Sequence, residues 1–173
     1  NRFGDYFYPH ISGTAQSHNF YPVSHMTPED GMAVMAVGLG HYVAEGERAF
    51  RFSPSYPRMD VISQQDIYKN SQVNFYAVDL KNEDLNLLDG EKAGMVSLDI
   101  SEAEKHGTLN HVASVMDIEN DTIIPGLDRA GPRVINFADI LKYDYIPLSS
   151  TLKTVLDVVA EATANPSEIE FAV

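Results

Sequence analysis

Apolar and polar residues alternate along much of the chain with a period of two, which is typical of half-buried strands. These segments are separated by Gly, Pro, Asn and Ser, which favour turns. Met32–Val37 is wholly apolar, and this predicts a strand that is buried on both faces. Gly13 interrupts another of these runs, which indicates a bulge or a close backbone approach. We expect strands over residues 6–8, 11–17, 32–37, 48–52, 73–80, 111–118, 122–124 and 168–171.

Two segments carry helix signals. Ser149 or Ser150 is expected to cap the best helix, which ends at Asn165-Pro166. A shorter helix is predicted near residues 99–106, with Ser101 as its N-cap and Glu104 completing a capping box. The pattern therefore predicts an α+β fold with a mainly antiparallel sheet and a few helices. The helical apolar stripe consists of Leu152, Val155, Leu156, Val159 and Ala162.

Composition narrows the possible partners and environment. The net charge of −13 comes from 25 acidic and 12 basic residues, and such a field repels nucleic acid and anionic membranes. No run approaches the roughly 18 apolar residues that a membrane span needs. The absence of Cys excludes disulfides and thiolate metal sites and fits a cytoplasmic protein.

The two ends predict that residues 1–173 form a single domain excised from a larger protein. Asn1 is preceded by no Met and followed by no signal-peptide pattern. The last segment, Glu168–Val173, has the pattern of a strand and ends on apolar residues. We therefore expect both ends to be cuts within a longer chain.

Considered one at a time, the motifs give only weak evidence for a particular function. Gly38-Leu39-Gly40 follows an apolar strand, where it could present backbone N–H groups to a phosphate or simply form a tight turn. The six histidines have no zinc-like spacing, and no Gly-x-Ser-x-Gly elbow is present. No catalytic residue is assigned on these grounds.

Glu168 and Glu170 give a sharper signal. Residues two apart in a strand project from the same face, while Ile169 and Phe171 project to the other face. Two carboxylates on a rigid element suit Mg²⁺, which prefers oxygen ligands and also binds phosphates. The alternative is an ordinary solvent-facing strand, because exposure is the commonest fate of Glu.

Several segments together resemble the ATP-grasp domain of the phosphoenolpyruvate synthase and pyruvate phosphate dikinase family. His10–Pro22 resembles the family's SGVAFSRNP-type segment, and Ala33–Gly46 resembles its apolar strand followed by Gly-Leu-Gly-Glu and a Val-x-x-Gly turn. Phe50–Pro54 continues the second match at the correct distance, and Pro166–Phe171 is similar to the Asp-Ile-Glu-Trp/Phe strand. Residues 55–145 are matched only by their place between these segments.

The resemblance implies the C-terminal part of an ATP-grasp domain that binds ATP and Mg²⁺. Such a lobe helps to pass a phosphoryl group to a histidine on another domain, which then phosphorylates pyruvate. A basic lobe would precede Asn1, the phosphohistidine would lie outside this chain, and the chain alone is expected to be inactive. The implied nucleotide-binding residues are Gly38, Gly40, His41, Glu168 and Glu170, of which Glu168 and Glu170 would bind the metal.

Departures from the family pattern keep other functions open. His41 replaces the acid of Gly-Leu-Gly-Glu, His18 replaces an Arg, and Glu168 stands where Asp is usual. One alternative is a catalytically degenerate ATP-grasp lobe that serves interdomain contact or ligand sensing. Another is an unrelated β-rich module with an aromatic binding face made of Tyr6, Phe7, Tyr8, Phe20 and Tyr21.

Overall fold

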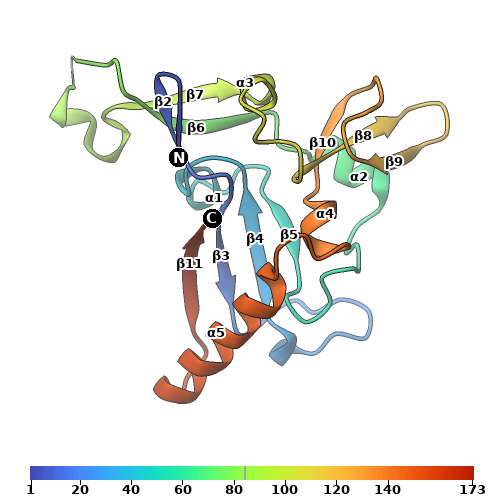
Figure 1. Ribbon diagram of the computed structural model, residues 1–173. Coiled ribbons are helices and arrows are strands. Elements are labelled where there is room, and N and C mark those ends of the chain that lie inside the picture. The colour runs from blue at the N-terminus through green and yellow to red at the C-terminus, as the bar shows by residue number, and fades with distance from the viewer. Residues whose placement is uncertain (84) are drawn as a thin grey trace.

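Three antiparallel sheets and five α-helices make up the described part of the chain, residues 1–83 and 85–173, in a computed structural model (Figure 1). The predicted α+β class with mostly antiparallel pairing is confirmed. Within the described ranges, no helix is both long enough and apolar enough to cross a membrane.

The central sheet joins the two ends of the chain. Its C-terminal strand pairs with the first long strand, so that residues 150 positions apart in sequence become neighbours. All four strands were predicted from the pattern of apolar residues, with bounds that agree to within two residues. In spatial order, the strands are β11 (Glu168–Ala172), β3 (Ser12–Gln16), β4 (Met32–Ala36) and β5 (Phe50–Phe52).

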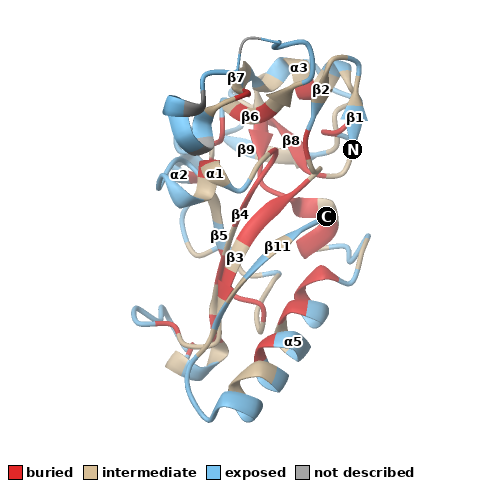
Figure 2. Cartoon of the chain, turned by 90° about the vertical axis from the view of Figure 1, so that its left-hand side faces the viewer, coloured by how far each residue is buried: buried red, intermediate tan, exposed pale blue. Residues whose placement is uncertain are grey.

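One face of the central sheet is covered. Residues paired directly across antiparallel strands project from the same face. Helix α5 (Leu148–Thr163) crosses this face diagonally and contacts β3 (Figures 1 and 2). One row of paired residues on this covered face consists of Ile169, Ala15, Ala33 and Phe52.

The opposite face is more open. Glu170 pairs with Thr14, and the same row continues through Val34 to Arg51. Glu170 and Arg51 are exposed, whereas Thr14 and Val34 are half-buried. The prediction that Met32–Val37 is buried on both faces is therefore wrong for the first half of β4. An apolar run alone does not reveal that one side lacks a covering layer.

Helix α5 is the long C-terminal helix that the sequence predicted, but its N-cap residue is not the predicted one. Pro147 occupies the N-cap position, and Ser149 and Ser150 lie within the first turn. The fixed φ of proline suits a helix start, and the hydroxyls of Ser150 and Thr151 donate to the Pro147 carbonyl. The buried apolar stripe of α5 is narrower than expected, because Val155 and Ala162 are exposed. The buried positions are Leu148, Ser149, Leu152 and Leu156.

A second sheet, the upper sheet, stands at one end of the central sheet. It includes the predicted strand over residues 73–80, and its short first hairpin precedes Tyr8, which is fully buried. The predicted strand over 6–8 is confirmed without Tyr8 itself. In spatial order, the strands are β1 (Arg2–Phe3), β2 (Tyr6–Phe7), β6 (Asn74–Asp79) and β7 (Met95–Asp99).

The third sheet contains the hairpin predicted across residues 119–121. Asp117 anchors its turn by accepting hydrogen bonds from the backbone of Glu119 and Asn120. In spatial order, the strands are β10 (Arg133–Ile135), β8 (Ala113–Asp117) and β9 (Thr122–Pro125).

Short helices fill the connections. The predicted helix near residues 99–106 is confirmed, but its N-cap is Asp99, whose side chain accepts from the Ser101 N–H at 2.9 Å. The Ser101 cap prediction is therefore wrong, because an acidic residue two positions earlier fills that role. This helix is α3 (Ile100–Lys105), and the other short helices are η1 (Pro28–Asp30), α1 (His41–Ala44), α2 (Gln64–Lys69), η2 (Leu87–Lys92) and α4 (Ala138–Leu141).

A main hydrophobic core connects these parts, and a smaller cluster of Ile67, Met116 and Val134 packs α2 against the third sheet. Figure 2 shows the buried residues concentrated along β3 and β4 and at the end that carries the upper sheet. Ile169 and Phe171 pack against this core from β11, as the alternation predicted. Hydrophobic burial therefore fixes which side of β11 carries the two glutamates.

Gly13 gives a test of the β11–β3 contact. A Cβ at this position would clash with the Val34 carbonyl oxygen and would lie 2.6 Å from Cζ of Phe171. We predict that Gly13→Ala lowers the free energy of unfolding by about 1–3 kcal/mol, measured by urea denaturation. Gly40→Ala is the control, because its Cβ would lie 3.9 Å from Ser12 Cβ at a helical φ of −58°. Equal stability of the two variants would contradict the close approach.

Candidate functional site

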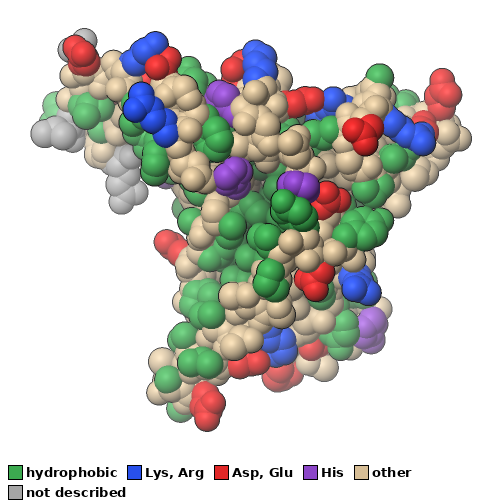
Figure 3. All heavy atoms as spheres, in the orientation of Figure 1, with side chains coloured by type: hydrophobic (Ala, Val, Ile, Leu, Met, Phe, Trp, Pro, Cys, Tyr) green, Lys and Arg blue, Asp and Glu red, His purple; other side chains and the backbone are tan. Residues whose placement is uncertain are grey.

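A cleft of about 820 Å³ lies at the junction of the central and upper sheets. Its walls come from β3, the segment after β4, and β11, with Phe7 and Met95 contributed by the upper sheet. In the space-filling view, the molecule is broad at the end of the upper sheet and hollowed beside the central sheet (Figure 3). Four predicted segments therefore contribute to one cavity: residues 6–8, 11–17, 38–41 and 168–171.

The turn after β4 forms one border of the cleft. Gly38 has a φ of +91°, and a Cβ there would lie 2.7 Å from the carbonyl oxygen of Tyr76. The Ser12 hydroxyl donates to the Gly38 carbonyl at 2.6 Å, and the Leu39 N–H donates to the Tyr76 carbonyl at 2.9 Å. The predicted tight turn is confirmed, and it is clamped between β3 and β6.

Only one of the backbone N–H groups in residues 39–41 of this turn donates a hydrogen bond within the described residues. The Leu39 N–H is already paired with β6, so it cannot also face a phosphate. Helix α1 starts directly after Gly40, and the Gly40 and His41 N–H groups have no acceptor in the described ranges. Leu39, Gly40 and His41 line the cleft, whereas Gly38 supports the turn from behind.

Strand β11 brings Glu170 to the opposite border. Glu168 and Glu170 are both exposed and alternate with Ile169 and Phe171, so both carboxylates lie on the open face. Glu170 lines the cleft, but Glu168 does not. Two residues along a strand span about 6.6 Å, which places Glu168 beyond the rim. Neither glutamate takes part in an ion pair within 4 Å among the described residues.

His41 is held from behind by Glu45, one helical turn later. The Nε2 atom of His41 lies 3.0 Å from Oε1 of Glu45. This nitrogen is enclosed and has no partner with hydrogen-bond geometry, so the contact is mainly electrostatic. The imidazole also meets the Tyr76 ring edge-on, with ring centroids 5.3 Å apart.

Glu45 is the centre of a charged cluster. Lys92 Nζ donates to its Oε1 at 2.7 Å, and the Tyr76 hydroxyl donates to its Oε2 at 2.9 Å. These hydrogen bonds, with Lys92 first and Tyr76 second, lower the pKa of Glu45 to about 2. The same contacts raise the pKa of Lys92 and of Tyr76. Glu45 is therefore an anion at neutral pH and binds η2, β6 and α1 together.

The cleft suits a hard cation only in part. Within residues 1–83 and 85–173, no group of three or more His, Asp and Glu side chains lies close enough together to hold a metal ion. Glu170, with the Thr14 hydroxyl beside it, offers oxygen ligands of the kind that Mg²⁺ takes together with water and phosphate. The described lining contains no Lys or Arg, so any phosphate charge would be neutralised by groups from elsewhere.

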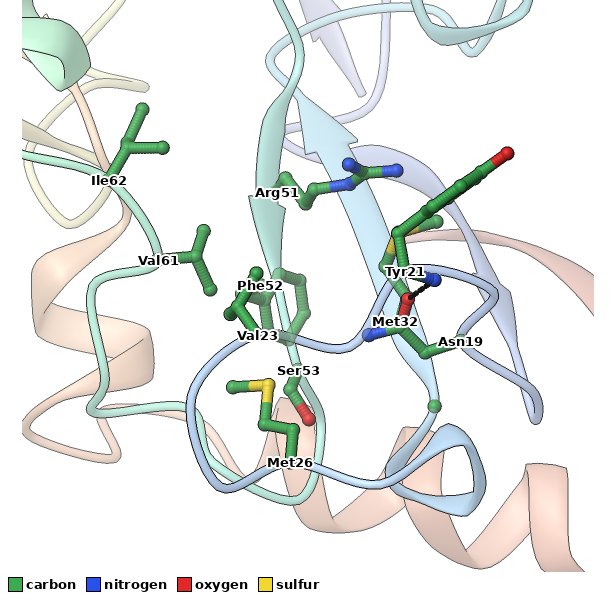
Figure 4. A pocket seen from close by; sticks show the side chains of 11 residues that line it. Asn19, Tyr21, Val23, Met26, Met32, Arg51, Phe52, Ser53, Val61 and Ile62 are labelled. Carbon is green, nitrogen blue, oxygen red and sulfur yellow. Dashed lines mark hydrogen bonds between the residues drawn. The ribbon is translucent and has the colours of Figure 1, made fainter.

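A smaller pocket of about 110 Å³ lies away from this cleft (Figure 4). Val23, Met26, Val61 and Ile62 give it apolar walls, and Arg51 and Tyr21 lie along one side of it in the close-up. It contains none of the predicted nucleotide-site residues. We therefore place the candidate site in the larger cleft.

The proposed aromatic face is not assembled. Tyr8 is fully buried in the core, while Phe7 lines the large cleft. Phe20 and Tyr21 are 71% and 79% exposed on a separate loop, where Phe20 packs edge-on against His18. Because these side chains point to different parts of the molecule, they form no common binding surface.

Ser12, Glu45, Tyr76 and Lys92 are functional candidates that the sequence did not predict. Ser12 lay inside a predicted strand, where a hydroxyl gives no separate signal. The spacing of His41 and Glu45, four residues apart, was a detectable helical pair. The contributions of Tyr76 and Lys92 depend on pairing across 31 and 47 residues and have no local pattern.

Comparison with models of known protein families, with curated proteins and with solved structures finds no match to this chain.

The hydrogen bonds to Glu45 predict that its carboxyl group titrates at a lower pH than that of an ordinary glutamate. We expect the Glu45 side-chain carboxyl to titrate near pH 2 in a ¹³C NMR experiment, below its ordinary value of 4.5. Since the folded pKa is the lower one, this group stabilises the folded protein above about pH 4.5 and loses that contribution as pH falls toward 2.

Lys92→Met should move the Glu45 midpoint upward, because the Lys92 hydrogen bond is the largest cause of the shift. Lys69→Met is the control, because it removes the same charge from the end of α2, an element that contributes no residue to this cluster. A wild-type midpoint near 4.5, or an equal effect of both variants, would contradict the cluster.

Proposed function

We propose that this chain is the ATP- and Mg²⁺-binding lobe of a larger phosphotransferase that resembles phosphoenolpyruvate synthase and pyruvate phosphate dikinase. In this proposal, a phosphoryl group passes from ATP to a histidine on another domain. The observation that carries the proposal is the common cleft of Gly40, His41 and Glu170. These residues come from motifs about 130 positions apart that were assigned to one site from the resemblance alone.

The proposed roles follow from the chemistry of each group. Glu170 would bind Mg²⁺ directly, and Glu168 would act from the rim through a water ligand or after a small rearrangement. The free N–H groups of Gly40 and His41 would face the phosphates. Bound Mg²⁺ would neutralise charge that develops during phosphoryl transfer, while this lobe mainly positions the reactants.

The charge distribution supports a shared site. The chain carries a net charge of −13, and no Lys or Arg lines the described cleft. A triphosphate needs more positive charge than one metal supplies, so a basic lobe in the same parent protein would complete the site. We expect the chain alone to bind Mg·ATP no tighter than millimolar, and to be inactive.

The second candidate is a degenerate ATP-grasp lobe that serves interdomain contact or ligand sensing. It is favoured by His41, which stands at the acidic position of the family motif and is already engaged with Glu45. The two candidates differ in whether the parent protein transfers a phosphoryl group.

Phosphoenolpyruvate formation from ATP and pyruvate by the protein containing this chain separates them. We predict that Glu170→Gln lowers kcat by at least about 100-fold, because it removes a metal ligand from the transferring phosphate. His41→Gln should retain more activity, because Gln keeps a hydrogen-bonding group at the cleft. Glu161→Gln on the exposed side of α5 is the charge-matched control. No activity in the wild type would support the degenerate lobe, and full activity of Glu170→Gln would overturn the site.

A further inference from the structure

We propose that the small pocket beside β5 is a binding site for a short aliphatic carboxylate. The acid group of this ligand would meet Asn19 and Arg51, and its tail would enter the apolar part of the pocket. The pocket of about 110 Å³ lies where the loop over residues 19–28 approaches the start of β4 and the end of β5 (Figure 4). It shares no residue with the large cleft, so the inference does not depend on the proposed function.

Asn19 supplies a hydrogen-bond donor that the fold does not use. Only 7% of this residue is exposed. Its Oδ1 accepts the Tyr21 N–H at 3.0 Å, which identifies the other terminal atom as the amide nitrogen. This Nδ2 has no hydrogen-bond partner among the described residues, yet it is not sealed from solvent. In the close-up it is directed into the space beside Phe52 (Figure 4). An acceptor oxygen in the pocket would satisfy it.

The walls around this donor are held by the protein itself. The Asn19 N–H donates to the Pro28 carbonyl at 2.7 Å and closes the loop. On the other side, the hydroxyls of Ser53 and Ser55 both donate to the Asp30 carbonyl, at 3.2 and 3.0 Å. The pocket is therefore formed before any ligand binds, as is usual for small-molecule sites.

Strand β5 adds a cation to the same pocket. Arg51 pairs with Val34 in the sheet and takes part in no ion pair within 4 Å among the described residues. In the close-up its guanidinium extends toward Tyr21 and away from Val61 (Figure 4). A guanidinium donates through a planar fork that matches a carboxylate. Because the described lining contains no Asp or Glu, both free donors favour an anionic acceptor.

The apolar walls limit what the acid group can carry. Val23, Met26, Val61 and Ile62 line the pocket. A cavity of about 150 Å³ holds one benzene molecule, so a pocket of about 110 Å³ has room for roughly four carbon atoms. A phosphate would leave these walls unused and would bring a second negative charge that one arginine does not balance. The ligand that fits is a monocarboxylate with a short apolar tail, such as isovalerate.

The first experiment compares three ligands by NMR titration of the chain at neutral pH and constant ionic strength. Isovalerate should bind saturably with a Kd on the order of 1 mM, and should shift the side-chain amide signals of Asn19 and the methyl signals of Val23 and Met26. Isovaleramide lacks the charge and acetate lacks the tail, so each should bind at least about fivefold more weakly. Equal binding of either comparison ligand, or no saturable shift at Asn19 with isovalerate, would overturn the proposal.

The second experiment removes the two donors separately. Asn19→Asp keeps an acceptor for the Tyr21 N–H but replaces the donor with an anionic oxygen, and Arg51→Met removes the charge while keeping an apolar stem. Each should weaken isovalerate binding at least about fivefold. Isovaleramide binding to Arg51→Met should stay at the wild-type level, because the apolar walls remain in place.

Arg58→Met is the matched control, because it removes the same charge from an exposed residue after β5 that does not line this pocket. It should leave isovalerate binding unchanged. An equal loss in Arg51→Met and Arg58→Met would mean that only the overall charge of the region matters, and undiminished binding to Arg51→Met would remove the cation from the site. Either result would overturn the proposal.

Discussion

The pairing of β11 with β3 is the contact on which the arrangement of the cleft depends. Five consecutive residue pairs join Glu168–Ala172 to Ser12–Gln16. Reciprocal hydrogen bonds between Ser17 and Ser167 close one end of the pairing, and bonds between Val173 and Ile11 close the other. Without this register, Glu170 would have no fixed position relative to Thr14 and the turn after β4. A shift by one residue would turn both glutamates into the core.

The sequence predicted the elements whose signal is local. Alternation and short apolar runs identified β3, β4, β6, β8 and β11, and the helical spacing of apolar residues from Leu152 to Ala162 identified α5. It missed β7 and β10, whose pairing is decided by distant partners, and helices as short as α1 and α4. The N-caps of the helices were predicted incorrectly. Asp99 and Pro147 occupy these positions, although nearby serines also have side chains that can cap a helix.

For the candidate site too, the sequence predicted the local features and missed the long-range contacts. Gly40, His41 and Glu170 were assigned to one place, and the structure brings them to one cleft. Glu168 lies on the expected face of β11 but does not line the cleft, because two residues along a strand are about 6.6 Å apart. The network behind His41 could not be predicted, because Lys92 and Tyr76 reach Glu45 through tertiary folding. Local motifs thus identified residues that line the cleft, and long-range packing determines how these residues are held.

The central claim is that Glu170 and the Gly40–His41 turn border a site for a metal nucleotide. Paramagnetic broadening by Mn²⁺ in the presence of ATP tests it most directly, because it reports distance to the metal even when binding is millimolar. The account predicts that the amide signals of Thr14, Gly40, His41 and Glu170 broaden first, and that Glu170→Gln abolishes this selectivity. Broadening that begins at other surface acids, such as Glu161 on α5, and is unchanged by Glu170→Gln would contradict it.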